Sequence, residues 1–412
     1  MSKMKKMSRK QRAVLHKKRQ RRRIILLIVE IILLFVLGAA AFAMQKLDKM
    51  QVNGVNEKKL EVYHDTGDYT NIALFGLDSR EEELEGGVRS DCIMIASVNN
   101  STKEVKVVSV YRDSFLQQED GTYDKANAAY SYGGPEEAIA LLNRNLDLDI
   151  KKYLSVDFNA LADAIDCLGG IDIDVTPEEA YYVNGYCTET AKVVGRKTAL
   201  LDHAGLQTFN GIQAVSYARI RYMDSDFKRT ERQRIVLQKT AEKAKKASLL
   251  TLNSTIDKVL PQVSTNLSTS DFVGLASSIT KYKFGETAGF PYNVETPDSI
   301  PGYEGSFVVP VGYANDVKQL HKFLFGQDDY QVSDKVTQID SDIVYLTGIS
   351  GDNSYSSDDG SQTADTGADA GYTDDQGAGS TDDTWSEDTY SEDTYGTDTY
   401  SDETYTDDTQ GY

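Results

Sequence analysis

The chain is poor in the residues that build disulfide-rich domains and histidine-centred active sites. Its 412 residues include only three cysteines and four histidines. Three cysteines are too few for a disulfide framework, and His64 and His203 have no companions for a catalytic triad or a metal site. No Lys-Ser or Lys-Thr pair directly follows the turn at Gly133 and Gly134, which argues against a phosphate loop for nucleoside triphosphates.

Charge of one sign is missing from each end of the chain. Residues 351–412 hold 18 Asp or Glu and no Lys or Arg, whereas residues 1–23 hold 12 Lys or Arg and no acid. The net charge of −20 argues against a protein built mainly to bind nucleic acid, although a local basic site can still bind a phosphate-bearing ligand.

The one long apolar run covers residues 24–44, which include a single charge, Glu30. At about 1.5 Å per residue it is long enough to span a bilayer core of about 30 Å, so it predicts a transmembrane helix. A cleaved signal peptide is the alternative. The basic residues before the run place the N-terminus in the cytoplasm by the positive-inside rule. We therefore expect a single-pass protein of the cell membrane whose larger part, after residue 45, is extracellular.

The rest of the sequence predicts one α/β domain, layered, with a central mixed sheet flanked by helices. Apolar or alternating runs predict strands at residues 71–76, 92–98, 104–110 and 171–175. Helical periodicity covers residues 135–146, 159–168, 210–217, 227–248, 270–282 and 314–325. The expected organisation is a basic cytoplasmic segment (1–23), the membrane helix (24–44), a linker (45–69), the domain (70–330, core 70–250), a second linker (331–350) and a disordered acidic tail rich in Ser, Thr, Asp and Tyr (351–412).

Three charged residues are expected to meet at one sheet edge. If the first two strands are antiparallel, Asp78 at the end of one approaches Asp91 at the start of the other, and the following hairpin returns Arg112 to the same edge. Two carboxylates close together suit Mg²⁺ with retained waters. The alternative is a charged surface loop with ordinary ion pairs.

Arginines form a second concentration of charge between residues 219 and 234. Arg219 and Arg221 act together if the chain straightens after about residue 217, while Arg229, Arg232 and Gln233 share one helix face. Cations at a helix N-terminus oppose the macrodipole, so the cluster favours a bound anion, for which phosphate is the natural candidate. A solvated basic face, paired with acids nearby, is the alternative.

At these residues the chain resembles the LytR-CpsA-Psr family. The resemblance lies in six blocks that occur in order: residues 71–80, 89–91, 109–113, 125–134, 168–175, and 217–221 continued through 224–226 and 231–233. It covers about residues 70–250 closely and extends more loosely to about residue 330. The family resembled consists of membrane-anchored phosphotransferases of Gram-positive bacteria, which move teichoic acid or capsule-like glycopolymers from undecaprenyl-pyrophosphate carriers to peptidoglycan.

By this resemblance, Asp78 and Asp91 hold Mg²⁺ and act in catalysis together with Arg112, Arg219 and Arg221. The resemblance also implies a set of side chains that bind the substrate pyrophosphate: Arg80, Arg112, Lys125, Arg219, Arg221, Arg229, Arg232 and Gln233. It further implies an apolar tunnel for the lipid between the sheet and the helices. Two departures, Tyr111 in place of a usual proline and Cys92 in place of a common threonine, are expected to alter strand packing rather than chemistry.

Several alternatives stay open from the sequence. The protein could transfer the polymer to water as a polyprenyl-pyrophosphate hydrolase, or it could be a non-enzymatic adhesin or wall-sensing regulator in which the acidic tail is the working part. Asp91 and Asp113 are both candidates for a general base. The sequence does not indicate whether Cys167 and Cys187 pair.

Overall fold

The computed structural model describes residues 51–77, 87–221 and 226–351. The expected cytoplasmic segment and membrane helix lie outside these residues, as does the acidic tail beyond Gly351. Within the described ranges, none of the helices combines the length and the apolar character that crossing a membrane requires.

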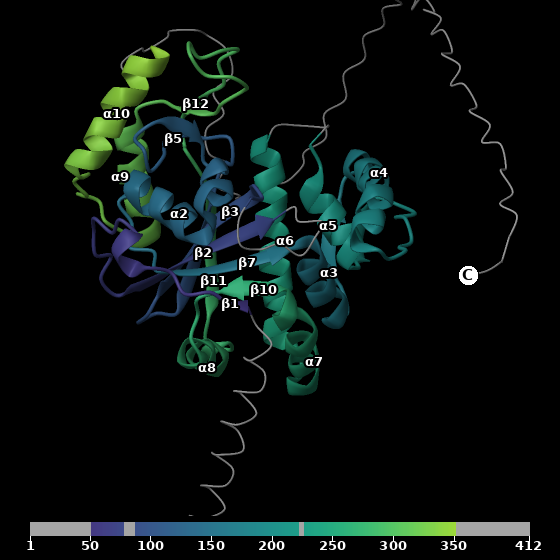
Figure 1. The fold of residues 1–412 in the computed structure, drawn as a ribbon. Helices are drawn as coiled ribbons and strands as arrows, with labels where there is room; N and C mark the ends of the chain where they lie inside the picture. Colours follow the sequence, from purple (N-terminus) through teal and green to yellow (C-terminus); the bar gives the residue numbers. More distant parts are fainter. Residues whose placement is uncertain (1–50, 78–86, 222–225, 352–412) are drawn as a thin grey trace, which may run out of the picture. The chain divides into compact units, whose positions relative to one another are not determined.

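A mixed sheet of seven strands forms the centre of the fold (Figure 1). Across the sheet the order is β1 (Gln51–Val52), β10 (Val263–Thr265), β7 (Lys152–Asp157), β2 (Tyr69–Leu77), β3 (Ser90–Asn99), β4 (Glu104–Val110) and β11 (Lys283–Phe290). The β2–β3 and β3–β4 pairs are antiparallel, as the sequence predicted, whereas β2 pairs with β7 and β4 pairs with β11 in parallel.

Alternation along the central strands divides side chains between the two faces of the sheet. In β2, Ala73, Phe75 and Leu77 join the main core, while Leu74 and Gly76 line a cavity on the opposite face. The same period assigns Leu154 and Val156 of β7 to the cavity. One face of these strands therefore packs in the main core, and the other face lines the cavity.

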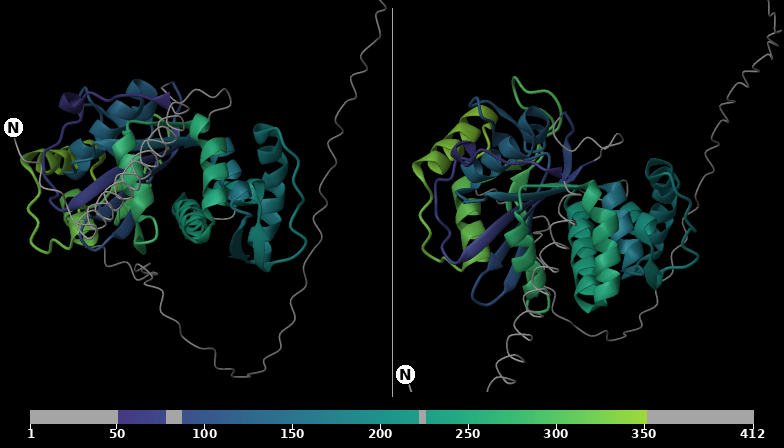
Figure 2. Two further views of the ribbon diagram at one scale, coloured as in Figure 1. Left: turned by 90° about the horizontal axis from the view of Figure 1, so that it is seen from below. Right: turned by 60° about the horizontal axis from the view of Figure 1, so that its bottom comes forward.

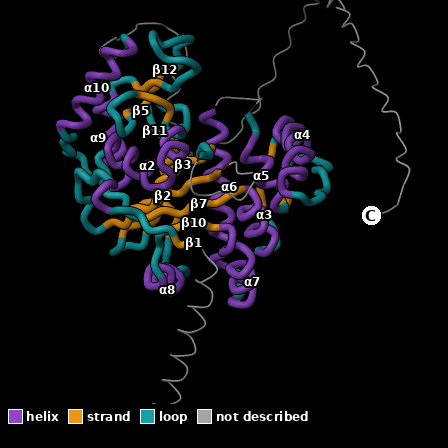
Figure 3. The backbone as a smooth tube through the Cα atoms, in the orientation of Figure 1, coloured by secondary structure: helices purple, strands orange, loops and turns teal. Residues whose placement is uncertain are grey.

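Helices cover both faces of the sheet (Figures 1 and 3). The main core packs one face against α2 (Ala128–Leu146), α9 (Tyr313–Phe325) and α10 (Asp334–Thr347). Within α2, Gly133 and Gly134 leave helical geometry, and a regular helix resumes from Pro135, where the sequence predicted it to begin. Proline is tolerated there because the first turn of a helix needs no donor from it.

The opposite face carries a second helical layer, visible beside the sheet in Figure 2. It contains α3 (Phe158–Cys167), α4 (Pro177–Val194), α5 (Gly211–Arg219), α6 (Asp226–Lys246) and α7 (Leu249–Val259). Helices α3 and α5 approach closely at Gly211, where an added Cβ would lie 2.1 Å from the carbonyl oxygen of Ala162. Glycine at this position therefore sets the spacing of two helices that line the site.

Shorter elements complete the described chain. They are η1 (Glu57–Lys59), η2 (Leu260–Gln262), α8 (Thr269–Ser278) and three two-stranded sheets that pair β5 (Phe115–Gln117) with β6 (Tyr123–Lys125), β8 (Ile171–Val175) with β9 (Gly205–Phe209), and β12 (Val294–Glu295) with β13 (Val309–Pro310).

The structure confirms a mixed α/β domain with a central mixed sheet, and it corrects the boundaries expected on either side. Residues 331–350 were expected to be a linker but contain α10, which buries Val336, Ile339 and Ile343 in the main core. The expected linker at 45–69 likewise contributes the fully buried Leu60. The domain therefore extends beyond the predicted 70–330 in both directions.

Candidate active site

A cavity of about 690 Å³ lies between the sheet and the second helical layer. Its walls come from β2, β3 and β7 on one side and from α3, α4, α5 and α6 on the other. The lining residues are Leu74, Phe75, Gly76, Asp91, Cys92, Met94, Arg112, Leu154, Val156, Asp157, Phe158, Leu161, Tyr186, Glu189, Val215, Ala218, Arg219, Arg221, Arg229, Gln233, Val236 and Leu237.

The lining changes from charged to apolar along each wall. On α6, Arg229 precedes Val236 by seven residues, which is about 10 Å along a helix. On β3, Asp91 is followed by Met94, and on β7 the apolar Leu154 precedes Asp157. One end of the cavity therefore gathers guanidinium groups, and the other is walled by aliphatic side chains.

A β-bulge turns Asp91 toward the cavity. In the β2–β3 ladder Gly76 pairs with Cys92 and Leu77 pairs with Ser90, which leaves Asp91 as the extra residue. A bulge of this kind re-aims side chains next to a site, so Asp91 and its neighbour Cys92 both line the cavity. Gly76 opposite has no room for a side chain, because a Cβ there would lie 2.8 Å from that of Cys92.

Asp91 joins two arginines that are far apart in the sequence. One carboxylate oxygen lies 2.5 Å from Nη1 of Arg112, and the other accepts a hydrogen bond of 3.1 Å from Nη2 of Arg221. The approach of Asp91 and Arg112 agrees with the predicted meeting of the strand ends, whereas Asp78 and Arg80 lie outside the described residues. Asp91 thus holds two cations at the charged end of the cavity.

Asp113 extends this charged group toward Lys125. Its carboxylate accepts from Nε of Arg112 at 3.2 Å and lies 2.9 Å from Nζ of Lys125. Burial alone would raise the pKa of Asp113, but Lys125 and Arg112 override it and hold that pKa below the ordinary value. Burial would lower the pKa of Arg112, yet Asp91 and Asp113 raise it. Asp113 and Arg112 are therefore both ionised at neutral pH.

Arg219 and Arg221 reach the cavity from the end of α5. The helix ends at Arg219, and Ile220 takes an extended ψ of 127°, so the chain straightens two residues later than the sequence predicted. The Arg219 guanidinium lies 4.9 Å from the centre of the Phe158 ring and contacts Thr190 and Glu189. The backbone N–H of Arg221 donates to the Tyr186 hydroxyl. Both arginines are thus oriented by neighbouring helices.

Arg229 is the most buried charge of the site. Its side chain is 2% exposed and lies 2.6 Å from Asp226, yet none of its three nitrogens has a well-formed hydrogen bond among the described residues. Burial lowers the pKa of Arg229 and raises that of Asp226. The buried amide oxygen of Gln233, one turn further along α6, also has no hydrogen-bond partner among the described residues. The nitrogens of Arg229 can therefore still donate hydrogen bonds to a ligand, and the amide oxygen of Gln233 can still accept one.

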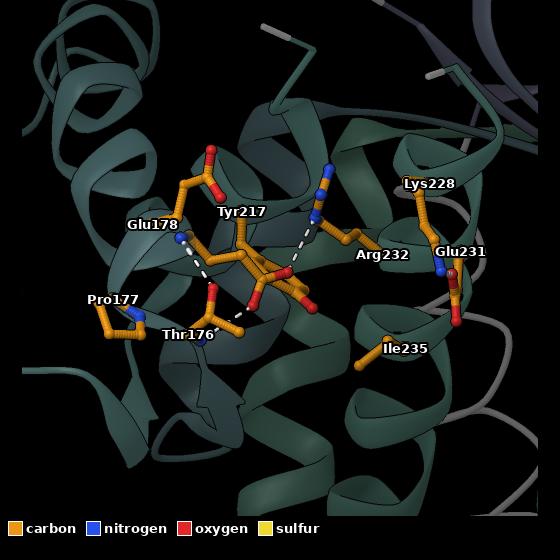
Figure 4. Close-up of a pocket in the computed structure, with 9 residues that line it drawn as sticks. Thr176, Pro177, Glu178, Tyr217, Lys228, Glu231, Arg232 and Ile235 are labelled. Atoms are coloured by element: carbon orange, nitrogen blue, oxygen red, sulfur yellow. Dashed lines mark hydrogen bonds and ion pairs between the residues drawn. The ribbon is translucent and has the colours of Figure 1, made fainter. Parts of the chain in front are cut away.

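Arg232 lies elsewhere, although the sequence placed it on the same face as Arg229. Its Nε is 3.2 Å from Glu179 at the start of α4, and its side chain is 5% exposed. It lines a second cavity on the other flank of α6 (Figure 4). The expected contact between Arg232 and pyrophosphate is therefore not supported by its position, since the neighbouring helix supplies a carboxylate partner.

The described residues alone do not fit a metal ion. They contain no group of three or more His, Cys, Asp or Glu side chains suited to hold one, and both oxygens of Asp91 already bind arginines. The second expected ligand, Asp78, lies outside these residues. A Mg²⁺ ion at Asp78 and Asp91 stays a prediction.

The cysteines have no evident chemical role. Burial raises the pKa of Cys92 to about 12, so this thiol is protonated at neutral pH although it lines the cavity. Cys167 and Cys187, whose pairing the sequence left open, are both free thiols.

Sequence reasoning missed several polar residues of the site. Asp157, Tyr186 and Glu189 line the cavity, and Asp226 pairs with Arg229. Asp157 could have been found as the residue between a strand and a helix, where it caps α3 by accepting from the N–H of Ala160. Tyr186 and Glu189 lie on α4, a helix that the sequence analysis did not predict.

Comparison with known proteins gives a consistent family. A sequence profile described as the LytR_cpsA_psr family matches residues 37–303. The polyisoprenyl-teichoic acid–peptidoglycan teichoic acid transferase TagT of Bacillus subtilis is 28% identical over 241 residues, which cover 57% of this chain and 72% of TagT. TagV of the same organism is 30% identical over 205 residues, which cover 48% of this chain and 49% of TagV.

Solved structures support the fold. The structure of TagT bound to LI-WTA superposes with a TM-score of 0.53 at 24% identity, and the match covers 66% of this chain and 98% of that one. Because the family profile spans well over half of the 412 residues, the chain belongs to the LytR-CpsA-Psr family.

Proposed function

We propose that the protein is a membrane-anchored extracellular phosphotransferase, which moves a teichoic acid or capsule-like glycopolymer from an undecaprenyl-pyrophosphate carrier to peptidoglycan. The observation that carries the proposal is the single cavity whose lining passes from four guanidinium groups to aliphatic walls. A pyrophosphate joined to a polyprenyl chain has the same two parts in the same order. The names of relatives such as TagT, a polyisoprenyl-teichoic acid–peptidoglycan teichoic acid transferase, support this choice.

The charged end suits a diphosphate rather than a single carboxylate. Arg112, Arg219, Arg221 and Arg229 face three carboxylates in the lining, those of Asp91, Asp157 and Glu189. Guanidinium groups bind phosphate oxygens through paired hydrogen bonds and keep their charge at every relevant pH. The nitrogens of Arg229, which have no well-formed hydrogen bond among the described residues, add donors for an entering anion.

The apolar end suits the lipid. Leu74, Met94, Val156, Val236 and Leu237 line it from both the sheet and the helices, so isoprene units would leave water on entry. Burial of apolar surface contributes about 25 cal/mol per Å². This term favours long prenyl chains over free pyrophosphate.

The proposed reaction is a phosphoryl transfer. A hydroxyl of peptidoglycan, which we assign to N-acetylmuramic acid, attacks the phosphorus attached to the polymer; the new O–P bond forms, the bond to the bridging oxygen breaks, and polyprenyl phosphate leaves. The proton of the hydroxyl passes to solvent. Such transfers depend mainly on positioning and on charge stabilisation, to which the arginines of the cavity contribute.

The two carboxylates first considered as general bases are poorly suited to that role. Asp91 is held between Arg112 and Arg221, and the low pKa of Asp113 makes it a weak base. The already activated pyrophosphate linkage lowers the need for one.

Product analysis tests the proposal. The full chain in detergent micelles is given undecaprenyl-pyrophosphate glycopolymer, radiolabelled in the polymer, together with purified peptidoglycan. Label bound covalently to peptidoglycan is the expected result. Release of soluble polymer phosphate would instead identify a hydrolase, and absence of turnover with intact carrier binding would favour a sensor.

Arg221→Ala is the informative variant for this assay. The Arg221 side chain is 44% exposed and its guanidinium contacts Asp91, so its loss should lower turnover about 100-fold without unfolding the protein. Arg196→Ala is a matched control, because Arg196 pairs with Asp163 and Asp166 outside the cavity. Equal turnover in the two variants would contradict the proposed role of the arginine cluster.

A further inference from the structure

A second cavity, of about 540 Å³, lies on the opposite flank of α6 from the active-site cavity (Figure 4). Ligand pockets commonly fall between about 300 and 1,000 Å³. Its lining combines the N-terminal turn of α4, one residue of α5 and the first turns of α6: Thr176, Pro177, Glu178, Glu179, Tyr217, Lys228, Glu231, Arg232 and Ile235.

The two cavities share α6 as a wall. Arg229 and Gln233 face the active-site cavity, whereas Lys228, Glu231 and Ile235 face the second one. These positions alternate within the first turns of the helix, so the second cavity opens one helix width from the guanidinium cluster. A ligand there would lie beside the proposed site of transfer.

The charges of the second cavity are arranged differently from those of the first. Its two cations are both paired inside it, Arg232 with Glu179 at 3.2 Å and Lys228 with Glu231 at 3.0 Å. Glu178 then adds a carboxylate that balances neither cation. The lining therefore carries a net negative charge, which disfavours a polymer of phosphodiesters and favours a neutral ligand.

The surfaces that remain fit a saccharide. Tyr217, Pro177 and Ile235 supply apolar wall, while the carboxylates and the ammonium group stand around it, as Figure 4 shows. Carboxylates accept from hydroxyl and amide groups, and Lys228 donates to oxygens. An apolar wall with a few convergent polar groups is the usual composition of a small-molecule site.

We propose that this cavity binds a neutral, amide-bearing glycan segment of the acceptor and so presents the acceptor to the donor across α6. The position beside the reaction rests on the proposed function, whereas glycan binding itself does not. Lys228 and Glu231 form one ion pair whose side chains are exposed enough to exchange their mutual contact for contacts with sugar hydroxyls.

The probe is chitotetraose, a neutral tetramer of N-acetylglucosamine, titrated into the full chain in detergent micelles and observed by saturation-transfer NMR. The test variant is Lys228→Ala with Glu231→Ala. It should bind the sugar at least about tenfold more weakly, since it loses several polar contacts. Lys322→Ala with Asp328→Ala is the matched control, because that pair is also exposed and lies 2.9 Å apart.

Two further readouts separate this inference from the proposed function. Affinity for polyprenyl pyrophosphate should be unchanged in the Lys228 and Glu231 variant, and the KM for peptidoglycan should rise more than kcat falls. Sugar binding equal in test and control variants, or no binding by the parent chain, overturns the inference. A third outcome is that the parent binds the sugar, the Lys228 and Glu231 variant binds it weakly, and neither chain binds polyprenyl pyrophosphate. This outcome would overturn the proposed function and support the glycan site.

Discussion

Under the proposed function, the carboxylate of Asp91 occupies the place of a ligand phosphate in the free protein. That carboxylate binds Arg112 and Arg221, which would otherwise repel each other at the end of the cavity. A pyrophosphate must compete with this carboxylate, or the carboxylate must turn to another cation. The bulge that aims Asp91 is therefore as important for the site as the charge itself.

Replacing Arg229 and its partner should leave the protein at least as stable as the parent but should weaken ligand binding. The double variant Arg229→Met with Asp226→Leu replaces a buried ion pair by apolar side chains, where burial lowers the pKa of Arg229 and raises that of Asp226. Replacing such a pair by apolar groups is often neutral or stabilising. We expect an unfolding temperature no lower than that of the parent, but affinity for polyprenyl pyrophosphate about 10- to 100-fold weaker.

Thermal unfolding with and without inorganic pyrophosphate measures both effects for this variant. The parent should gain stability from the ligand by mass action, and the variant should gain less. A large drop in the unfolding temperature of the free variant would assign Arg229 a structural role instead.

Asp113 should stabilise the protein at neutral pH but not in acid. Its pKa is lower in the folded chain than the ordinary value because Lys125 and Arg112 override the effect of burial. The contribution is thus present above the unfolded pKa of about 4 and is lost as the pH falls through the folded pKa. Asp113→Asn should lower the free energy of unfolding by about 2 kcal/mol at pH 7.

Urea unfolding of the parent and of Asp113→Asn at a series of pH values checks this prediction. The difference between them should shrink from about pH 4 downward. A difference that is constant or grows in acid would contradict the assigned ion pairs.

At the residue scale, the sequence predicted which charged residues belong to the site better than it predicted which residues each of them contacts. Arg112, Arg219, Arg221, Arg229 and Gln233 all line one cavity, although only the family resemblance had joined Arg112 to the other four. Helical spacing also placed Arg232 with Arg229, but spacing carries no information about the helix packed opposite. Glu179 of α4, 53 residues earlier in the sequence, accepts a hydrogen bond from Arg232.

Among the elements, the contact between β11 and the start of α6 depends on the unusual Tyr111. Its ring packs edge-on against Phe227 at 4.6 Å and passes over Gly289 of β11, where an added Cβ would lie 2.1 Å from the tyrosine hydroxyl. The sequence predicted altered strand packing at this departure. The structure indicates that Tyr111 and Gly289 are a matched pair that seats the helix carrying Arg229.

A double-mutant cycle tests this pairing. Gly289→Ala should destabilise the parent by about 2 kcal/mol, as overpacking usually does. In a Tyr111→Ala background the same change should cost little, because the ring is gone. The coupling, measured by chemical unfolding, should be about 1–2 kcal/mol; strictly additive costs would show that the two residues do not share space.

Elements with strong periodicity were predictable, and those that rely on partners were not. The antiparallel β2, β3 and β4 and the helix ending at Phe325 were expected, because apolar residues recur at the right intervals. Helix α4 was missed although Thr176 and Glu179 form a capping box. Only Ala180, Val183 and Cys187 of this helix are buried in the local core, while Tyr182, Tyr186, Ala191 and Val194 pack against it partly buried.

At the scale of the whole molecule, the predicted boundaries between the domain and its linkers were wrong. Residues 331–350 were expected to be a linker, yet Asp147 binds both Tyr330 and Ser333 and fixes the chain as it enters α10. One buried carboxylate near the end of α2 thus joins segments 186 residues apart. Composition cannot reveal such a contact, because it depends on where the two segments meet.

Truncation distinguishes a linker from a structural helix. A chain ending at residue 330 loses α10 and the burial of Val336, Ile339 and Ile343. At about 1.5–3 kcal/mol for each buried side chain, the loss of roughly 5–9 kcal/mol is comparable with the whole stability of many domains.

We expect this truncation to unfold the protein, whereas a chain ending at Gly351 should keep the parent's unfolding temperature and its affinity for polyprenyl pyrophosphate. Circular dichroism with ligand titration measures both, and a folded, binding-competent 1–330 chain would show that α10 contributes little. Retained binding and turnover in the 1–351 chain would also count against the adhesin hypothesis, in which the acidic tail is the working part.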